Sequence, residues 1–271
     1  MPVYKDFLDE VPEYIVKTTQ YARILIDEKI WDAITHDDLD NWLSNFKEPE
    51  EKLLAGLLLE SLIHRSSEQT KSLLATAIDV AISSALYPNP LEALENESYY
   101  DFLTSKRSQG DHVKIVPVIR DSDPPTKSGP SVARLYKRLL KVSEDYMTWP
   151  WLIGDSYEKG ARLFIFIDDT LATGDQFNSF FENVNYDLYT EAIFLYIPLL
   201  AHQEGLGNVN KKFPKLLVSP VEVVDDSYSF FETNSKKIED IEELYLKVAE
   251  KFLNKRFFNK MGKGYKGLGK V

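Results

Sequence analysis

The sequence of 271 residues contains no cysteine, which excludes disulfide bonds and thiolate metal sites. Histidine is scarce as well, and the four imidazoles lack the spacing that is typical of a structural zinc site. No apolar run reaches the length of about eighteen residues that predicts a membrane-spanning helix. The N-terminus lacks the basic-then-apolar pattern of a secretion signal, and together with the missing cysteine this favours a cytoplasmic protein.

Positive charge is scarce over most of the chain. The net charge is −11, and residues 251–271 alone contribute seven basic residues and no acid, so the rest of the chain carries −18. An acidic body disfavours nucleic-acid binding, because phosphate contacts need clustered lysine and arginine. We therefore expect no nucleic-acid partner except through the basic tail, and a solvated end is the more ordinary role for such a tail.

The first part of the chain, residues 1–95, is predicted to be a helical N-terminal region. Apolar residues recur there at three-to-four spacing, in residues 14–34, 53–63 and 73–86. Ser66 and Gln69 form a capping-box pattern before the last of these segments. The run LLAGLLLESLI is apolar on most faces and predicts a buried helix. Pro88 and Pro90 end the helical pattern, and we place a domain boundary at residues 87–96.

Residues 96–258 alternate between strand-like and helix-like segments, which predicts an α/β domain with a mostly parallel sheet. Pro117 restricts the first strand to an edge or irregular position, and the continuous apolar second strand suits burial on both faces. The expected strands are residues 113–119, 163–167 and 192–200, with one or two more in residues 216–224, and the expected helices are residues 131–146, 175–183 and 238–258. A basic, glycine-rich tail, residues 259–271, follows.

The most specific pattern in the sequence is LFIFIDDTLATGDQF, residues 163–177. Its strand ends in two adjacent carboxylates, Asp168 and Asp169, and ligands of open α/β sheets bind at the carboxyl ends of the strands. A tight turn of small and hydroxylated residues can present backbone N–H groups to an anion just before a helix begins. The residues of this expected phosphate cradle are Thr170, Leu171, Ala172, Thr173 and Gly174.

This segment resembles the phosphoribosyl pyrophosphate (PRPP) motif of type I phosphoribosyltransferases, and the lead-in Lys159-Gly160-Ala161-Arg162 is similar to the turn before that motif. The resemblance implies a sheet of the phosphoribosyltransferase type with a helical N-terminal extension. It also implies that Asp168 and Asp169 contact the ribose hydroxyls, directly or through Mg²⁺ and water. The turn that follows would wrap the 5′-phosphate.

The resemblance further implies a pyrophosphate-binding loop after the first core strand. The loop in that position, residues 120–130, reads RDSDPPTKSGP. Lys127 offers a positive charge there, and Ser128 and Gly129 offer hydrogen-bond donors. These three residues are therefore the candidate pyrophosphate-binding residues.

The interval between Tyr146 and Lys159 is short. Members of the family carry a further strand and a flexible lid before the Asp-Asp strand, and this interval has little room for both. A hood that binds the acceptor base is not recognisable either. Trp149 and Trp151 flank Pro150 in this interval, and we expect them to be packing residues rather than a base-stacking platform.

Three other kinds of protein also place acids after an apolar strand. A P-loop NTPase needs the pattern G-x-x-x-x-G-K-[ST], which does not occur in this sequence. A haloacid-dehalogenase-type phosphatase needs Asp-x-Asp, but Thr170 stands two residues after Asp168. A receiver domain places its acid pair near the start of the domain, whereas this pair comes late.

The leading hypothesis is a protein that binds PRPP or a related ribose phosphate with Mg²⁺ and displaces pyrophosphate at the anomeric carbon. Mg²⁺ prefers oxygen ligands, and the pyrophosphate and ribose would supply most of them. One alternative is a non-catalytic nucleotide or ribose-phosphate sensor that signals to a protein partner through the helical N-terminal region. Another is an antiphage effector, because the helical front end, the Asp-Asp motif and the Gly-Tyr-Lys-Gly-Leu-Gly tail resemble a divergent phosphoribosyltransferase-like group from bacterial conflict gene neighbourhoods, some beside reverse transcriptases as in retrons.

Overall fold

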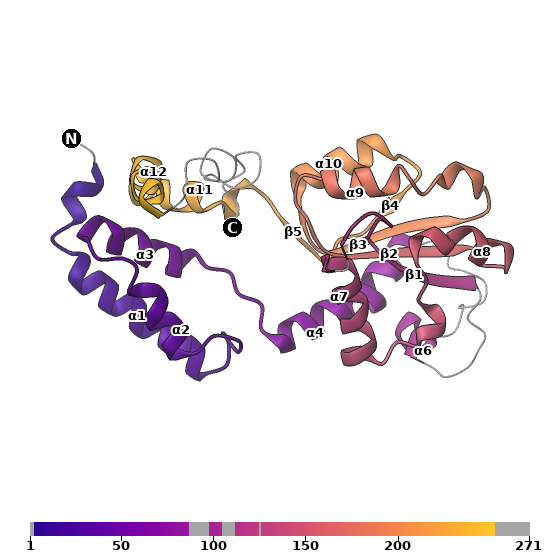
Figure 1. Cartoon of the computed structure of the whole chain (residues 1–271), viewed down its shortest axis with the longest axis horizontal. Helices are drawn as coiled ribbons and strands as arrows, with labels where there is room; N and C mark the ends of the chain where they lie inside the picture. Colours follow the sequence, from indigo (N-terminus) through magenta and orange to yellow (C-terminus); the bar gives the residue numbers. More distant parts are fainter. Residues whose placement is uncertain (1–2, 87–97, 105–111, 125, 253–271) are drawn as a thin grey trace. The chain divides into compact units, whose positions relative to one another are not determined.

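The computed structural model describes residues 3–86, 98–104, 112–124 and 126–252, and the chain divides into two compact units (Figure 1). The helical unit contains the residues up to Gln69 together with those from Asp225 onward, and the α/β unit runs from Thr70 to Val224. These limits differ from the predicted ranges 1–95 and 96–258. The predicted boundary at residues 87–96 and the basic tail, residues 259–271, lie outside the described residues.

The helical unit is built from both ends of the chain. Its centre is the leucine-rich helix α3, which is buried on most faces as its sequence predicts, and which packs against α1, α11 and α12. Leu53 and Leu57 of α3 share a hydrophobic cluster with Leu244 and Val248 of α12. The helices are α1 (Val11–Asp27), α2 (His36–Leu43), α3 (Pro49–Ser61), α11 (Phe230–Ser235) and α12 (Ile241–Phe252), with short 3-10 helices at Val3–Phe7 and Asp226–Tyr228.

The predicted capping box before the third apolar segment is present at the start of α4 (Ser67–Thr76). The backbone N–H of Gln69 donates to Ser66 Oγ at 3.2 Å, and the backbone N–H of Ser66 donates to Gln69 Oε1 at 2.9 Å. The helical path continues through a π-helical turn, Ala77–Ala81, into α5 (Ile82–Leu86). The buried side chains of this path, including Leu74 and Ile78, pack in the core of the α/β unit, because they share a cluster with the sheet.

The sheet of the α/β unit is parallel throughout, as the alternating pattern predicts. Its strands are β1 (Val113–Pro117), β2 (Leu163–Leu171), β3 (Ile193–His202), β4 (Leu217–Val218) and β5 (Glu222–Val224). The order is β1-β2-β3-β4, and β5 pairs with β3 further along that strand. Pro117 ends the edge strand β1, where its missing N–H costs no ladder bond, and this agrees with the sequence-based expectation.

Helices cover both faces of the sheet (Figure 1). Alternate residues of β2 serve the two faces: Ile165 belongs to the cluster that contains α4 and α7, and Phe166 belongs to the cluster that contains α9. The remaining helices are α6 (Tyr99–Thr104), α7 (Ser128–Leu135), α8 (Ile153–Glu158), α9 (Asp175–Phe181) and α10 (Gln203–Lys212), with 3-10 helices at Glu144–Tyr146, Pro150–Leu152 and Tyr186–Leu188.

Three predicted helices have other bounds in the structure. The helix expected at residues 175–183 is α9, which ends at Phe181. The helix expected at residues 131–146 begins at Ser128 as α7, passes into a π-helical turn at Tyr136–Leu140, and ends because Lys141 adopts a left-handed conformation with φ +64°. The helix expected at residues 238–258 begins at Ile241, and its continuation beyond Phe252 lies outside the described residues. Among the helices of the described ranges, none has the length and apolarity needed to span a membrane.

Candidate functional site

The strand β2 carries the Asp-Asp pair to the carboxyl edge of the sheet. It lies between β1 and β3, and Asp168 pairs in register with Pro198 of β3. Because side chains alternate along a strand, the two acids face opposite sides, and Asp168 is only 2% exposed whereas Asp169 is exposed. The pair therefore combines one buried carboxyl group with one that is open to a ligand.

Asp168 is held by three hydrogen bonds. Its Oδ1 accepts from the backbone N–H of Asp169 at 3.0 Å and from Ser128 Oγ at 3.3 Å, and its Oδ2 accepts from the hydroxyl of Tyr196 at 3.4 Å. Burial raises the pKa of Asp168 well above its usual range, and the negative charge of Asp169 raises it further. In the absence of a cation, this environment favours the neutral form of the carboxyl group.

Tyr196 lies on β3 beneath the acid pair. Its ring is buried and stacks on Phe177 of α9 with ring centres 3.7 Å apart. Burial, followed by the charge of Asp168, raises the pKa of the Tyr196 phenol well above its usual range, so the hydroxyl keeps its proton and donates a hydrogen bond to Asp168. No sequence pattern marks Tyr196, because only the pairing of β2 with β3 brings it to the site.

The expected phosphate cradle is shorter than the sequence suggests. Thr170 and Leu171 belong to β2, paired with Leu200 and Ala201 of β3, so the strand continues two residues past the acid pair. Leu171 is buried and can offer a ligand only backbone groups. The turn itself consists of Ala172, Thr173 and Gly174, and Gly174 adopts φ +88°, which favours glycine.

Helix α10 supports this turn from behind. A Cβ atom placed on Gly205 would overlap the carbonyl oxygen of Ala172, so the helix backbone lies directly against the turn. Asn208 Nδ2 donates a hydrogen bond to the carbonyl oxygen of Thr173 at 3.0 Å. Helix α10 is not predicted from the sequence. The nearby glycines Gly205 and Gly207 are a sequence feature that indicates close approach of another backbone segment.

The hydroxyl of Thr173 is engaged by the first residue of α9. Thr173 Oγ1 donates to Asp175 Oδ2 at 3.0 Å and accepts from the backbone N–H of Asp175 at 3.3 Å. This places a carboxylate at the mouth of the turn. A phosphate that enters the turn would compete with Asp175 for the Thr173 hydroxyl.

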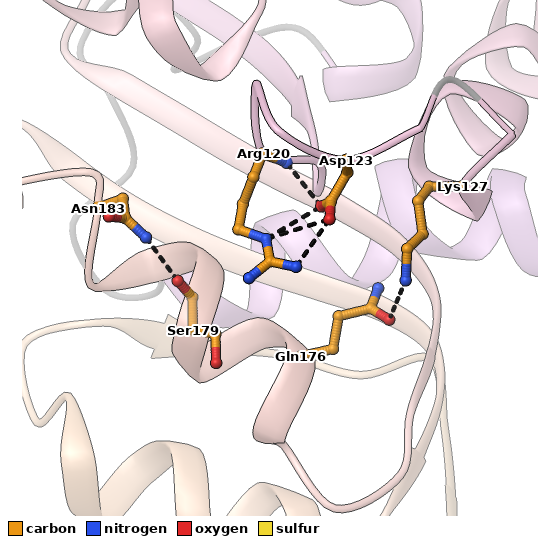
Figure 2. Close-up of polar contacts among 6 residues, drawn as sticks. All are labelled: Arg120, Asp123, Lys127, Gln176, Ser179 and Asn183. Atoms are coloured by element: carbon orange, nitrogen blue, oxygen red, sulfur yellow. Dashed lines mark hydrogen bonds and ion pairs between the residues drawn. The ribbon is translucent and has the colours of Figure 1, made fainter.

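The structure brings the candidate pyrophosphate-binding residues to the acid pair. Ser128 begins α7 and donates to Asp168. Lys127 Nζ donates to Gln176 Oε1 of α9 at 3.4 Å (Figure 2). Gly129 permits this approach, because a Cβ there would lie 2.5 Å from the carbonyl oxygen of Val118. Two segments that are about 40 residues apart in sequence therefore meet at one edge of the sheet.

The loop between β1 and α7 is fixed at its start by an ion pair. The backbone N–H, Nε and Nη2 of Arg120 all donate to the carboxylate of Asp123, at 3.0, 3.2 and 2.7 Å (Figure 2). The hydrogen bonds from Arg120 lower the pKa of Asp123 below its usual range, although its partial burial opposes this. The pair holds the loop in a tight turn. Arg120 lines the same groove as Phe180 of α9.

Acidic groups at the site are too few to form a metal cage. Within the residues that the structure describes, no three His, Asp or Glu side chains are arranged to hold a metal ion. Asp169 is exposed beside the buried Asp168. The carboxylates therefore fit a cation that arrives with a phosphate ligand and keeps most of its water, as Mg²⁺ does.

A parallel sheet, an acid pair at its carboxyl edge and a glycine-ended turn define a phosphoribosyltransferase-like α/β protein. Comparison with family models agrees, because the model of the PRTase-CE family matches residues 39–270. The chain belongs to the PRTase-CE family. The match begins in α2 and includes segments of the helical unit on both sides of the α/β unit, so both units are part of what defines the family. A search of curated proteins found no match.

Proposed function

We propose that this protein binds PRPP or a related ribose phosphate, together with Mg²⁺, and displaces pyrophosphate at the anomeric carbon. The observation that carries the proposal is the hydrogen bond between Ser128 and Asp168. It joins the candidate pyrophosphate loop to the candidate ribose acids at one edge of the sheet. A PRPP molecule carries its 5′-phosphate and its pyrophosphate on opposite sides of the ribose, so it needs two such binding segments around one acid pair.

Each part of the site has a role in this proposal. Asp169, the exposed acid, accepts hydrogen bonds from the ribose hydroxyls. The buried Asp168 holds the backbone of Asp169 in place by accepting a hydrogen bond from its N–H. Backbone N–H groups of the turn Ala172–Gly174 hold the 5′-phosphate, with the Thr173 hydroxyl as a further donor. Lys127 leaves Gln176 and stabilises the departing pyrophosphate. Asp169 would hold Mg²⁺ through water, and the cation would supply positive charge to offset that of the pyrophosphate.

The displacement requires one further reactant, an acceptor that carries the nucleophilic atom. The bond between the anomeric carbon and the pyrophosphate oxygen breaks, and a bond to a nucleophilic atom of the acceptor forms. The pyrophosphate leaves with the electron pair, and the acceptor loses its proton to solvent.

Calorimetric titration with PRPP in the presence and absence of Mg²⁺ tests the binding step. We expect binding by the wild-type chain, and a loss of at least about tenfold in affinity when Asp168→Asn and Asp169→Asn are combined, since hydrogen bonds to charged groups contribute about 1.5–3 kcal/mol each. Asp187→Asn is the matched control, because Asp187 is an exposed acid of the same unit whose partner is Lys215. Equal affinity of the double variant and the wild type would refute the proposal.

One observation favours a second candidate function, a sensor that binds the same ligand without turnover. Between β1 and β2, the described residues contain helices and a single isolated bridge from Met147 to Ile115, with no further strand. A lid that excludes water is a usual requirement for transfer to an acceptor other than water. In this case the ligand signal would reach a protein partner through the helical unit. Release of pyrophosphate on incubation with PRPP and nucleobases would select the enzyme, and binding without release would select the sensor.

A further inference from the structure

A groove lies in the α/β unit, at the end of α9 that is remote from the turn Ala172–Gly174, which we call the phosphate turn. It has a volume of about 450 Å³, within the range of about 300–1,000 Å³ typical of small-molecule sites. The loop after β1, the 3-10 helix Pro150–Leu152 and the last turn of α9 form its walls. Its polar and aromatic lining includes Arg120, Asp121, Ser122, Trp151 and Asn183.

Two tryptophans form a rigid platform at this groove. Trp149 and Trp151 are 43% and 52% exposed. Their rings stack on one another, with centres 5.1 Å apart and planes 6° apart. Pro150 lies between them as the first residue of the 3-10 helix, where its fixed φ restrains the backbone. Trp149 therefore holds the Trp151 ring in one orientation while Trp151 lines the groove.

The polar wall of the groove offers both donors and an acceptor. Arg120 uses its Nε and Nη2 for Asp123, and the described contacts leave its Nη1 for a ligand. Figure 2 shows Arg120 reaching from the loop toward the part of α9 that precedes Asn183. Asp121 is exposed and supplies a carboxylate, and Asn183 donates to the Ser179 carbonyl oxygen and keeps its own amide oxygen for other contacts. Such a wall matches a planar ring with acceptors and donors on its edge.

We propose that this groove binds a guanine base, stacked on Trp151. Guanine presents the acceptors O6 and N7, which match the Arg120 guanidinium, and the donors N1–H and N2–H₂, which match the Asp121 carboxylate. The face of the Trp151 ring contributes most of the affinity, because any base can stack on it. Arg120 and Asp121 select guanine among the bases.

This site is separate from the ribose-phosphate site. The turn Ala172–Gly174 precedes α9, and α9 rises by about 9 Å from Asp175 to Phe181 at 1.5 Å per residue. Asn183, which lines the groove, lies beyond the far end of this helix. The acceptor in a displacement at the anomeric carbon must lie next to the ribose. The guanine base therefore acts as a second ligand, and the inference does not depend on the proposed reaction.

Calorimetric titration of the full chain with guanosine tests the inference, and guanosine is chosen because it carries no phosphate for the Thr173 turn. We expect guanosine to bind more tightly than adenosine or cytidine. Trp151→Ala should weaken guanosine binding by about tenfold or more, and Trp151→Phe should retain most of the affinity. Arg120→Met should remove the preference for guanosine over adenosine. Leu152→Ala, which changes an exposed neighbour outside the groove lining, should bind as the wild type does.

The two sites are distinguished by crossed measurements. The combined Asp168→Asn and Asp169→Asn variant should keep guanosine binding, and Trp151→Ala should keep PRPP binding. Because Trp151 is half exposed, its truncation leaves the core intact, and an unchanged thermal unfolding midpoint checks this. The inference is overturned if the wild type does not bind guanosine, or if Trp151→Ala binds it as tightly as the wild type. Equal affinity for adenosine would overturn the assignment of guanine.

Discussion

At the scale of single residues, Asp168 and Asp169 show how one strand gives two identical side chains different chemistry. Their positions in β2 differ by one residue, so one carboxyl faces the core side of the sheet edge and the other faces solvent. Burial raises the pKa of Asp168, and the charge of Asp169 adds to this effect. A cation near Asp169 would offset the negative charge of Asp169 and so lower the pKa of Asp168. Binding of a cation-carrying ligand and the ionisation of Asp168 are therefore linked.

Asp168→Asn should raise the thermal unfolding midpoint at pH 7. The pKa of Asp168 is about 4 in the unfolded chain and is raised in the folded chain, so the folded chain holds the proton more tightly. The unfolding free energy of the wild type therefore falls as the pH rises from about 4 to the raised pKa. Asparagine has nearly the shape of aspartic acid and does not ionise, so the variant does not lose this unfolding free energy. Each kcal/mol of unfolding free energy gained raises the thermal midpoint by about 2–4 °C. Thermal melts between pH 4 and 8 measure the effect. A midpoint that falls on substitution at pH 7 would contradict a neutral, buried Asp168.

Asp175→Asn should tighten the binding of ribose 5-phosphate. The Asp175 carboxylate accepts the Thr173 hydroxyl and places a negative charge at the mouth of the phosphate turn. Its removal frees the donor and lessens repulsion, and we expect a gain of about three- to tenfold. The loss of an acid from the first turn of α9 costs only about 0.3–1 kcal/mol of stability. Titration with ribose 5-phosphate provides the measurement, and weaker binding by the variant would show that Asp175 assists the phosphate instead.

At the scale of elements, the strands were the most predictable part of the fold. The buried runs that form β1, β2 and β3 are nearly continuous in apolar residues, as two-sided burial requires. Helix α10 was missed because its sequence, QEGLGNVNKK, is polar and contains two glycines. Its position is determined by the turn that it supports, which local propensity does not encode.

The site was predictable only in the parts that lie close together in sequence. The Asp-Asp pair and the turn after it form a local pattern, and Lys127 and Ser128 were identified by their order along the chain. Tyr196 was not, because a tyrosine in a buried strand has no local mark of its function. Its role follows from the register that pairs β2 with β3.

Gly205→Ala and Gly207→Ala are a matched pair that tests the support from α10. A Cβ at Gly205 would overlap the Ala172 carbonyl oxygen, so the turn must move, with an expected loss of about 1–3 kcal/mol of stability and weaker phosphate binding. No atom outside the immediate chain lies within 4 Å of a Cβ at Gly207, so alanine there should stabilise the helix by about 0.5–1 kcal/mol. Denaturant melts and ribose 5-phosphate titrations compare the two. Similar behaviour of both variants would refute the close contact.

At the scale of the whole molecule, the helical unit joins the two ends of the chain, which periodicity along the sequence did not indicate. Lys251 Nζ and Glu51 Oε1 are 2.6 Å apart although 200 residues separate them. Glu51 is buried and also accepts hydrogen bonds from the backbone N–H groups of Lys47 and Glu48. The hydrogen bond from Lys251 contributes most to lowering the pKa of Glu51 to about 2, and the backbone donors add to it.

Glu51→Gln should destabilise the helical unit at neutral pH. The folded-state pKa of about 2 lies below the ordinary value near 4.5, so the stabilisation is fully present above pH 4.5 and is lost as the pH falls toward 2. We expect a loss of about 1.5–3 kcal/mol at pH 7, and a smaller difference from the wild type near pH 3. Glu13→Gln is the control, because its partner Lys17 is one turn away on the exposed face of α1. A pH-independent difference would show that packing, and not charge, accounts for the loss.

The helical unit and the α/β unit have hydrophobic clusters of their own, which predicts separate unfolding transitions. Scanning calorimetry should resolve two transitions, and Glu51→Gln should lower the one that belongs to the helical unit. PRPP with Mg²⁺, at about 100 times the dissociation constant of PRPP, should add about 2.7 kcal/mol to the unfolding free energy of the α/β unit. For a unit of this size, that is a rise of about 5–10 °C. If PRPP and Glu51→Gln shift one and the same transition, the units unfold together, and binding at the sheet edge is then energetically coupled to the helices.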